Sequence, residues 1–201
     1  MCYRWRTIVF GSPRHLDLQL LCTEKTRVRD ILDVWPSLPL FLLYDGFNRI
    51  FEGGRVFKAG SLDNTIAGLE HTDRVCRITF SDLLGSDLEK VLVAMQKPFP
   101  KLTRLELSSA RETGGLSQLF SIDPGDFYAP VVPDSFLGES AVRLRHLMLL
   151  RIPFPGLPKL LLSATHLESL ILENIPHSGY LSLDAMVTVL TTLTSLNLLS
   201  L

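Results

Sequence analysis

A six-residue pattern, L-x-x-L-x-L, recurs along the chain and constrains its fold more than any other feature. Side chains that alternate in this way bury one face of a β-strand. Two upstream segments, HLDLQL (15–20) and LPLFLLY (38–44), look like degenerate members of the same series. The five recognisable copies read VCRITF (75–80), LTRLEL (102–107), LRHLML (144–149), LESLIL (167–172) and LTSLNL (193–198).

Amphipathic stretches lie between the predicted strands, with apolar residues at the helical spacing i, i+3, i+4 and i+7. Ser86 and Glu89 stand at the spacing of a capping box, and Ser182 is positioned to cap the last helix. The predicted helices span 26–35, 61–71, 86–96, 156–164 and 182–193. The inward side of the last one is predicted to consist of Leu183, Met186, Val187 and Leu190.

Three of the four intervals between copies fall within the roughly 20 to 29 residues typical of leucine-rich repeats. The sequence therefore predicts an α/β fold: a leucine-rich-repeat solenoid with irregular repeats, parallel strands on its concave face and helices on its convex face. The repeat domain spans 13–201, and its Gly- and Pro-rich segment 111–140 is interpreted as a loop insertion. Neither G-x-G-x-x-G nor G-x-x-x-x-G-K-[ST] occurs, which argues against a doubly wound nucleotide-binding fold.

Composition narrows the range of partners. Apolar residues make up 46% of the 201 residues, but no uninterrupted apolar run reaches the length of about 18 residues that a membrane span needs. The formal net charge is −1, with basic and acidic residues interspersed, so neither nucleic acid nor a membrane surface is an expected partner. Cys2, Cys22 and Cys76 are widely separated, which indicates reduced thiols and a cytoplasmic or nuclear location.

Catalytic motifs are missing from the sequence. No G-x-S-x-G elbow occurs, and the five histidines form neither H-x-x-x-H nor H-E-x-x-H. We therefore predict no catalytic, cofactor-binding or metal-ligating residues, and a protein that is not an enzyme. One alternative stays open, an α/β enzyme whose site lies in the insertion at 111–140.

The repeat instead predicts a binding surface. Residues that alternate with the buried leucines face outward along the concave side of the sheet. Met148, Leu150 and Ile171 would form an apolar spot there, and such spots with polar rims mark protein contacts. The alternative is that the insertion folds back over this spot. The predicted protein-binding residues are Arg77, Thr79, Arg104, Glu106, His146, Met148, Leu150, Ile171, Glu173 and Asn197, and the predicted central column is Thr79, Glu106, Met148, Ile171 and Asn197.

The chain also resembles a family, the fungal, mushroom-type F-box/leucine-rich-repeat proteins. The segment RWRTIVFGSPRHLDLQL resembles the junction where the F-box of that family ends and the repeats begin. Residues 1–12 then correspond to the remnant of an F-box tail, around Cys2, Arg4, Trp5 and Arg6. The segments that carry the resemblance are 4–20, 88–107, 132–147, 154–172 and 175–196.

This resemblance implies a function. In the family, the F-box docks on the Skp-type adaptor of a cullin–RING ubiquitin ligase, and the repeats present the substrate. For this chain it implies a non-catalytic substrate-receptor module. A Skp-type adaptor is an expected partner only if a complete F-box lies upstream of residue 1. A truncated gene copy with no independent function is a further alternative.

Overall fold

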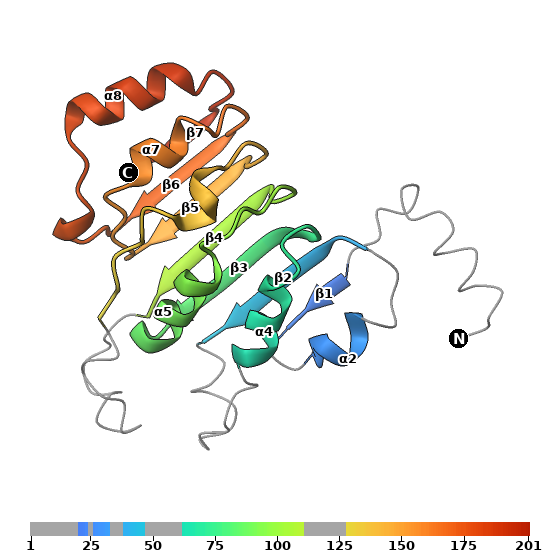
Figure 1. Cartoon of the computed structure of the whole chain (residues 1–201). Helices are drawn as coiled ribbons and strands as arrows, with labels where there is room; N and C mark the ends of the chain where they lie inside the picture. The colour runs from blue at the N-terminus through green and yellow to red at the C-terminus, as the bar shows by residue number, and fades with distance from the viewer. Residues whose placement is uncertain (1–19, 24–25, 33–37, 47–61, 111–127) are drawn as a thin grey trace.

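The chain forms an α/β fold around one seven-stranded parallel sheet (Figure 1). The computed structural model describes residues 20–23, 26–32, 38–46, 62–110 and 128–201. The strands lie side by side in chain order, from β1 at one edge to β7 at the other. Their bounds are Leu20–Cys22 (β1), Leu40–Asp45 (β2), Val75–Leu83 (β3), Arg104–Ser109 (β4), His146–Leu150 (β5), Ser169–Glu173 (β6) and Leu198–Ser200 (β7).

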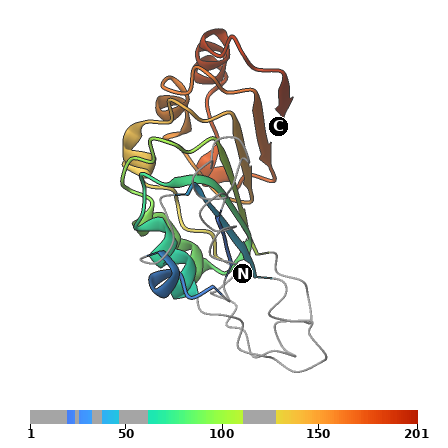
Figure 2. The same cartoon turned by 90° about the vertical axis from the view of Figure 1, so that its right-hand side faces the viewer.

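The described helices all cover one face of this sheet, as the view along its edge shows (Figure 2). The opposite face carries no helix within the part of the chain that the structure describes. None of these helices combines the length and apolar character needed to cross a bilayer. The helices are α2 (Val28–Leu32), α4 (Leu62–Leu69), α5 (Gly85–Ala94), α7 (Leu157–Leu161) and α8 (Leu183–Thr192), with 3-10 turns η2 (Phe136–Glu139) and η3 (His177–Gly179).

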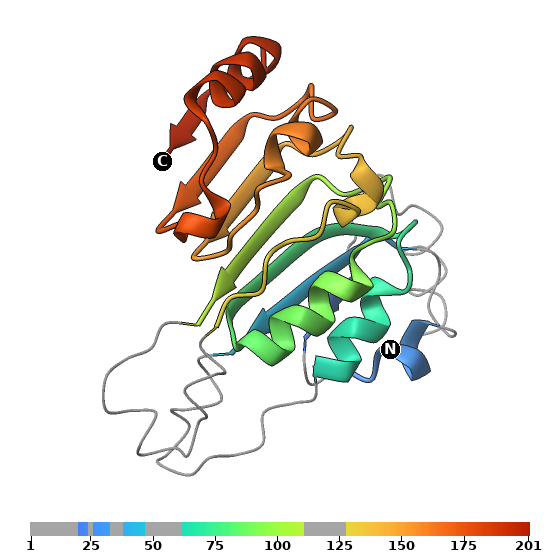
Figure 3. The ribbon, with the colours of Figure 1, turned by 60° about the vertical axis from the view of Figure 1, so that its left-hand side comes forward.

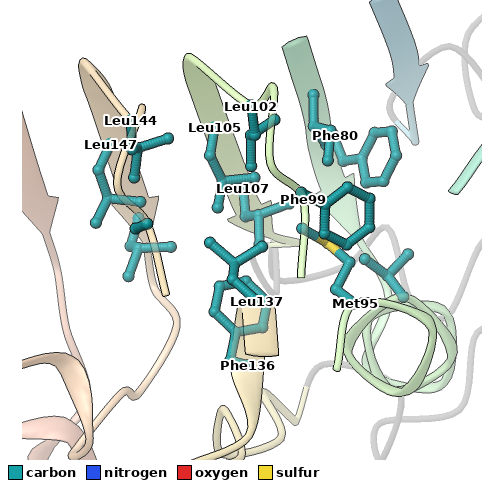
Figure 4. Packing of buried hydrophobic residues seen from close by; sticks show 14 of the residues in the cluster. Phe80, Met95, Phe99, Leu102, Leu105, Leu107, Phe136, Leu137, Leu144 and Leu147 are labelled. Atoms are coloured by element: carbon teal, nitrogen blue, oxygen red, sulfur yellow. The ribbon is translucent and has the colours of Figure 1, made fainter. Parts of the chain in front are cut away.

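The leucines of the sequence pattern form the core between the sheet and the helices (Figure 4). Leu105 and Leu147 have no exposed surface, and they pair across β4 and β5. Met95 and Phe99, which follow α5, close the layer from the helix side. Parallel strands with buried alternate leucines were the prediction, and the structure confirms them.

The same turn leads into successive strands. The amide of Leu102 donates a hydrogen bond to the carbonyl of Phe99 (3.1 Å), three residues earlier. Likewise, the amide of Leu167 donates to the carbonyl of Ala164 (3.0 Å). In these copies the first leucine is therefore fixed by a local turn before the chain enters the sheet.

The register predicted for the last strand is wrong. In the final copy Leu196, not Leu193, occupies the position of the first leucine, because the Leu196 amide donates to the Leu193 carbonyl (3.2 Å). As a result β7 pairs Ser200 with Ile171, where the sequence pattern predicted Asn197. The segment LTSLNLLSL holds two overlapping copies of L-x-x-L-x-L, and the structure uses the second, LNLLSL.

Two details of the helices also differ from the predictions. Helix α5 begins at Gly85 and has no side-chain cap, so the predicted capping box of Ser86 and Glu89 does not form. In α8, Leu183 and Val187 are exposed at 79% and 53%. Val189 is buried instead, with Met186 and Leu190 packed partly against the core. The predicted cap of α8 is confirmed, since the Ser182 hydroxyl accepts a hydrogen bond from the Ala185 amide (3.2 Å).

The segment predicted as a loop insertion contributes to the core in its second half. Residues 111–127 lie outside the described residues, but 128–140 pack on the helix side of the sheet (Figure 3). Phe136 and Leu137 of η2 are buried, and the Leu137 amide donates to the Met95 carbonyl (2.8 Å). Phe136 meets Phe154 edge to face at 5.6 Å. The 3-10 turn η2 thus covers the sheet between β4 and β5, where a helix would otherwise stand.

Left-handed turns recur at the ends of the strands. Asp82, Arg151 and Asn174 have φ values of 49°, 60° and 53°, although none is glycine. Each of them stands two positions after a buried residue of its strand, which is Phe80, Leu149 and Leu172, respectively. Side-chain and backbone hydrogen bonds must hold such turns, because this region of φ is strained for residues with a Cβ. The aliphatic residues that follow these turns are buried at Leu83 and Ile152 and partly buried at Ile175.

Candidate functional site

The register of the strands gathers the predicted binding residues on the face of the sheet opposite the helices. We call this the outward face, and it consists of the alternate residues of β2 to β6 that lie between the buried ones. Its rows cross the strands in register. They are Arg77–Arg104–His146–Ser169, Thr79–Glu106–Met148–Ile171 and Ser108–Leu150–Glu173.

Asn197 is not part of these rows. It precedes β7, and its backbone N–H donates a hydrogen bond to the carbonyl of Glu168 (2.8 Å). Ser200 takes the place in the central row that the sequence pattern assigned to Asn197, because β7 begins later than predicted. The outward face at this edge therefore ends on a serine hydroxyl rather than on an amide side chain.

A hydrogen-bonded network occupies the middle of the outward face. Arg104 donates from Nε to Glu106 Oε1 (2.7 Å), and its Nη2 lies 2.6 Å from the same oxygen. The Thr79 hydroxyl donates to Glu106 Oε2 (3.1 Å) from the neighbouring strand. One carboxylate thus fixes the side chains of β3 and β4, so that the centre of the face is rigid and its negative charge is neutralised by Arg104.

His146 joins this network at its β5 side. Its Nε2 lies 3.1 Å from Glu106 Oε1, but among the described residues this nitrogen has no hydrogen bond of good geometry. Burial lowers the pKa of the His146 imidazole, and the positive charge of Arg104 lowers it further, while Glu106 acts in the opposite direction. The imidazole is therefore held neutral near pH 7, and it adds a polar but uncharged edge beside the apolar residues of β5.

Two apolar spots flank the network. Met148, Leu150 and Ile171 lie half-buried on β5 and β6, as the sequence predicted. The described part of the predicted insertion, 128–140, lies on the helix side of the sheet and does not cover this spot. The remainder of that segment, 111–127, is outside the described residues. Apolar side chains that stay half-exposed on a sheet face are suited to contact another protein.

The second apolar spot was missed by sequence reasoning. Phe41 and Leu43 alternate with buried residues on β2 and pair with Arg77 and Thr79 of β3. Leu21 on β1 pairs with Phe41 and is 48% exposed. The signal was hidden because the strand LFLLYD is apolar on both faces, so it shows no alternation between apolar and polar residues. Its register with VCRITF would have placed these side chains on the outward face.

Between the two spots, Arg77 is a cation without an ion pair among the described residues. It is exposed, and it stands in register between Phe41 and Arg104. Arg104 is engaged by Glu106, so Arg77 supplies the excess positive charge at the centre of the outward face. The face can therefore bind groups through apolar contact at its two sides and through charge at its centre.

An ion pair between Arg151 and Asp82 fixes the carboxyl ends of the strands beside this face. Arg151 donates from Nε to the Ser109 carbonyl (2.7 Å), and its Nη2 donates to Asp82 Oδ1 (3.1 Å). The Asp82 amide donates in turn to the Ser108 hydroxyl (2.8 Å). These contacts join the ends of β3, β4 and β5 and hold Arg151 and Asp82 in their left-handed conformations.

The described residues also line a cavity of about 480 Å3 that is open to solvent, between the sheet, η3 and α8. The side chains that line it are apolar apart from those of Asn174 and Tyr180, and none of them is charged. Among the described residues no three of His, Cys, Asp and Glu gather as a metal site. The walls of this cavity therefore offer no carboxylate, imidazole or thiol for acid–base or nucleophilic chemistry.

Two of the cysteines, Cys22 and Cys76, lie within the described residues, and neither forms a disulfide with the other. Cys22 is buried, and this burial raises the pKa of its thiol. The Cys76 thiol is half-buried and lies 3.1 Å from the Leu40 carbonyl, to which it donates. A buried thiol with a raised pKa, such as that of Cys22, is structural rather than reactive.

Comparison with known protein families, with curated proteins and with solved structures finds no match to this chain. The function must therefore be inferred from the residues and the geometry described above.

Proposed function

We propose that this chain is a non-catalytic protein-recognition module built as a leucine-rich-repeat solenoid. Three observations support the solenoid. The strands follow one another across the sheet in chain order, the described helices cover one face, and the same turn precedes several strands. Such arrays leave one sheet face open along their length, and they use it as an extended binding surface.

The observation that carries the proposed function is the composition of the outward face. Its centre is a rigid, charge-neutralised network around Glu106, and its sides are the apolar spots of Phe41 and Leu43 and of Met148, Leu150 and Ile171. Interfaces between proteins combine such apolar contact area with a small number of fixed polar groups. The same face offers no cluster of groups suited to bond chemistry, so recognition fits it better than catalysis.

The resemblance to F-box/leucine-rich-repeat proteins suggests what kind of recognition this is. We propose that the outward face holds a protein substrate, in the manner of a substrate receptor of a cullin–RING ubiquitin ligase, in the cytoplasm or nucleus. Binding of a Skp-type adaptor is proposed only for a polypeptide in which a complete F-box precedes these repeats.

Two substitutions on the apolar spot test the proposal. Met148→Glu and Ile171→Lys place charges on half-buried surface residues, so we expect folding to be kept and partner binding to be lost. Partners are identified by crosslinking and mass spectrometry in cells that express the chain, and circular dichroism checks the fold. Val93→Glu is the matched control, because Val93 is 63% exposed on α5, on the opposite side of the sheet. If both face variants keep every partner that the control keeps, the outward face is not the binding surface.

A further inference from the structure

We propose that the outward face selects extended protein segments in which an aspartate or glutamate stands between two apolar residues, each two positions away from it. This inference rests on the proposed function and gives the chemical class of the partner. It follows from the positions of the two apolar spots and of Arg77.

The two apolar spots supply the anchors. Phe41 and Leu43 present half-exposed side chains on β2, and Met148 does so on β5. All three lie on the outward face, and β3 and β4 separate them. A segment that crosses the strands can therefore place one apolar side chain on each spot.

The distance between the spots fixes the spacing of these two side chains. Neighbouring strands lie about 4.8 Å apart, so the three steps from β2 to β5 span about 14 Å. An extended chain advances about 3.3 Å per residue, and this span corresponds to about four residues. Because alternate side chains of an extended chain point to the same side, residues i, i+2 and i+4 all face the sheet. The anchors are thus positions i and i+4.

Charge determines the residue at i+2. A segment that runs from Phe41 to Met148 crosses from the row of Arg77 to the row of Glu106, so this position lies over β3 and β4 between these two rows, within reach of the exposed Arg77 side chain. Glu106 already accepts from Arg104 and Thr79, so its charge is compensated. Arg77 is exposed and has no ion pair among the described residues, which leaves one uncompensated positive charge. A carboxylate at i+2 pairs with Arg77, and a lysine there is repelled.

Peptide binding tests the inference directly. Three fluorescein-labelled peptides are compared by fluorescence anisotropy with the whole chain, and their cores are Leu-Ser-Asp-Ser-Leu, Leu-Ser-Lys-Ser-Leu and Leu-Ser-Asp-Ser-Ser-Leu. We expect the first to bind about tenfold more tightly than the second, since like charges oppose the complex. We expect a similar loss for the third, because its second leucine points away from the sheet. Raising the salt concentration is expected to shrink the difference between the Asp and Lys peptides.

A charge reversal on the protein provides the complementary test. Arg77→Glu is expected to invert the preference, so that the Lys peptide binds more tightly than the Asp peptide. The matched control is Lys97→Glu, which changes an exposed charge in the turn after α5 and is expected to keep the wild-type preference. Equal binding of the Asp and Lys peptides to the wild-type chain, or no binding of the Asp peptide up to about 1 mM, overturns the inference.

The same assay separates this inference from the proposed function. If the peptides bind without preference for charge or spacing, but Ile171→Lys abolishes their binding, the outward face still recognises protein segments and only the proposed motif is wrong. If Ile171→Lys and Met148→Glu leave the binding of the Asp peptide unchanged, both the motif and the assignment of the outward face are wrong.

Discussion

A single carboxylate, Glu106, joins three strands of the outward face. It accepts from Thr79 on β3 and from Arg104 on β4, and it lies beside His146 on β5. The three contacts have different strengths. The contact with Arg104 is charge-assisted, while that with Thr79 links a neutral donor to the same group. The contact with the neutral His146 imidazole is the weakest of the three, because burial and the charge of Arg104 disfavour protonation of this ring.

Lower pH is expected to destabilise the fold through His146. The pKa of this imidazole is lowered in the folded chain, below the usual value near 6.5 that it has when unfolded. Between those two values the unfolded chain binds a proton that the folded chain does not, so acid favours unfolding. The stability is complete above about pH 6.5 and declines as the pH falls below it toward the lowered pKa of the folded chain.

Urea unfolding at pH 7 and pH 5 measures this effect. His146→Gln removes the titrating group, and we expect the variant to lose less stability between these pH values than the wild-type chain does. His166→Gln is the control, because His166 is exposed and lies outside the network. An equal loss of stability in His146→Gln and in the wild-type chain would contradict the assignment.

At the scale of elements, α8 and β7 are weakly held parts of the described chain. Only Val189 of α8 is buried, and β7 has three residues, of which Leu198 and Leu199 are 51% and 40% exposed. The cavity of about 480 Å3 lies directly beneath α8 and reaches Leu201. Side chains that line an open cavity lack packing partners on that side, so these two elements contribute little to the stability of the core.

The register of β7 is open to a chemical test. Ile171 pairs with Ser200 in the structure, whereas the first copy of the overlapping pattern would pair it with Asn197. We expect the double variant Ile171→Cys/Ser200→Cys to form a disulfide under mild oxidation, because paired residues on adjacent strands lie within the reach of that bond. The control is Ile171→Cys/Asn197→Cys, which is expected to stay reduced. Preferential crosslinking of the control pair would show that the earlier register is the correct one.

At the scale of the whole molecule, the parallel sheet and its buried face could be predicted from the sequence. In β3 and β4 polar and charged residues such as Arg77 and Glu106 alternate with buried apolar ones, so only one register buries the apolar side chains. The same reasoning failed where that contrast was lost. LTSLNLLSL offers two registers of equal leucine content, and LFLLYD of β2 is apolar on both faces.

The candidate site was predictable to a similar extent. The rows through Arg104 and Met148 follow from the alternation of the pattern, but the network around Glu106 depends on side-chain conformations that no spacing encodes. The apolar spot of Phe41 and Leu43 depends on the pairing of β2 with β3. The contribution of η2 to the core also lacked a signal, because a 3-10 turn with left-handed residues has no apolar period.

Protection from hydrogen exchange is expected to vary along the array. Central strands are paired on both sides, whereas β7 has three residues and stands at the edge of the described strands. We expect the amides of β3 to β5, such as that of Leu107, to exchange only through global unfolding, and those of α8 and β7 to exchange at least about a hundredfold faster. Mass spectrometry or NMR at the level of single amides measures this gradient. Equal protection of Leu107 and Leu199 would contradict it.

The order of the strands also determines how the molecule responds to force. Among the described strands, none is inserted between two that precede it in the chain, so each inner strand is hydrogen-bonded within the sheet to its two neighbours in sequence. Tension applied at the carboxyl end therefore loads the bonds between β7 and β6 first and reaches β5 only after β6 has come away. The sheet peels from that end one strand at a time, and each step releases slack without disturbing the strands that remain.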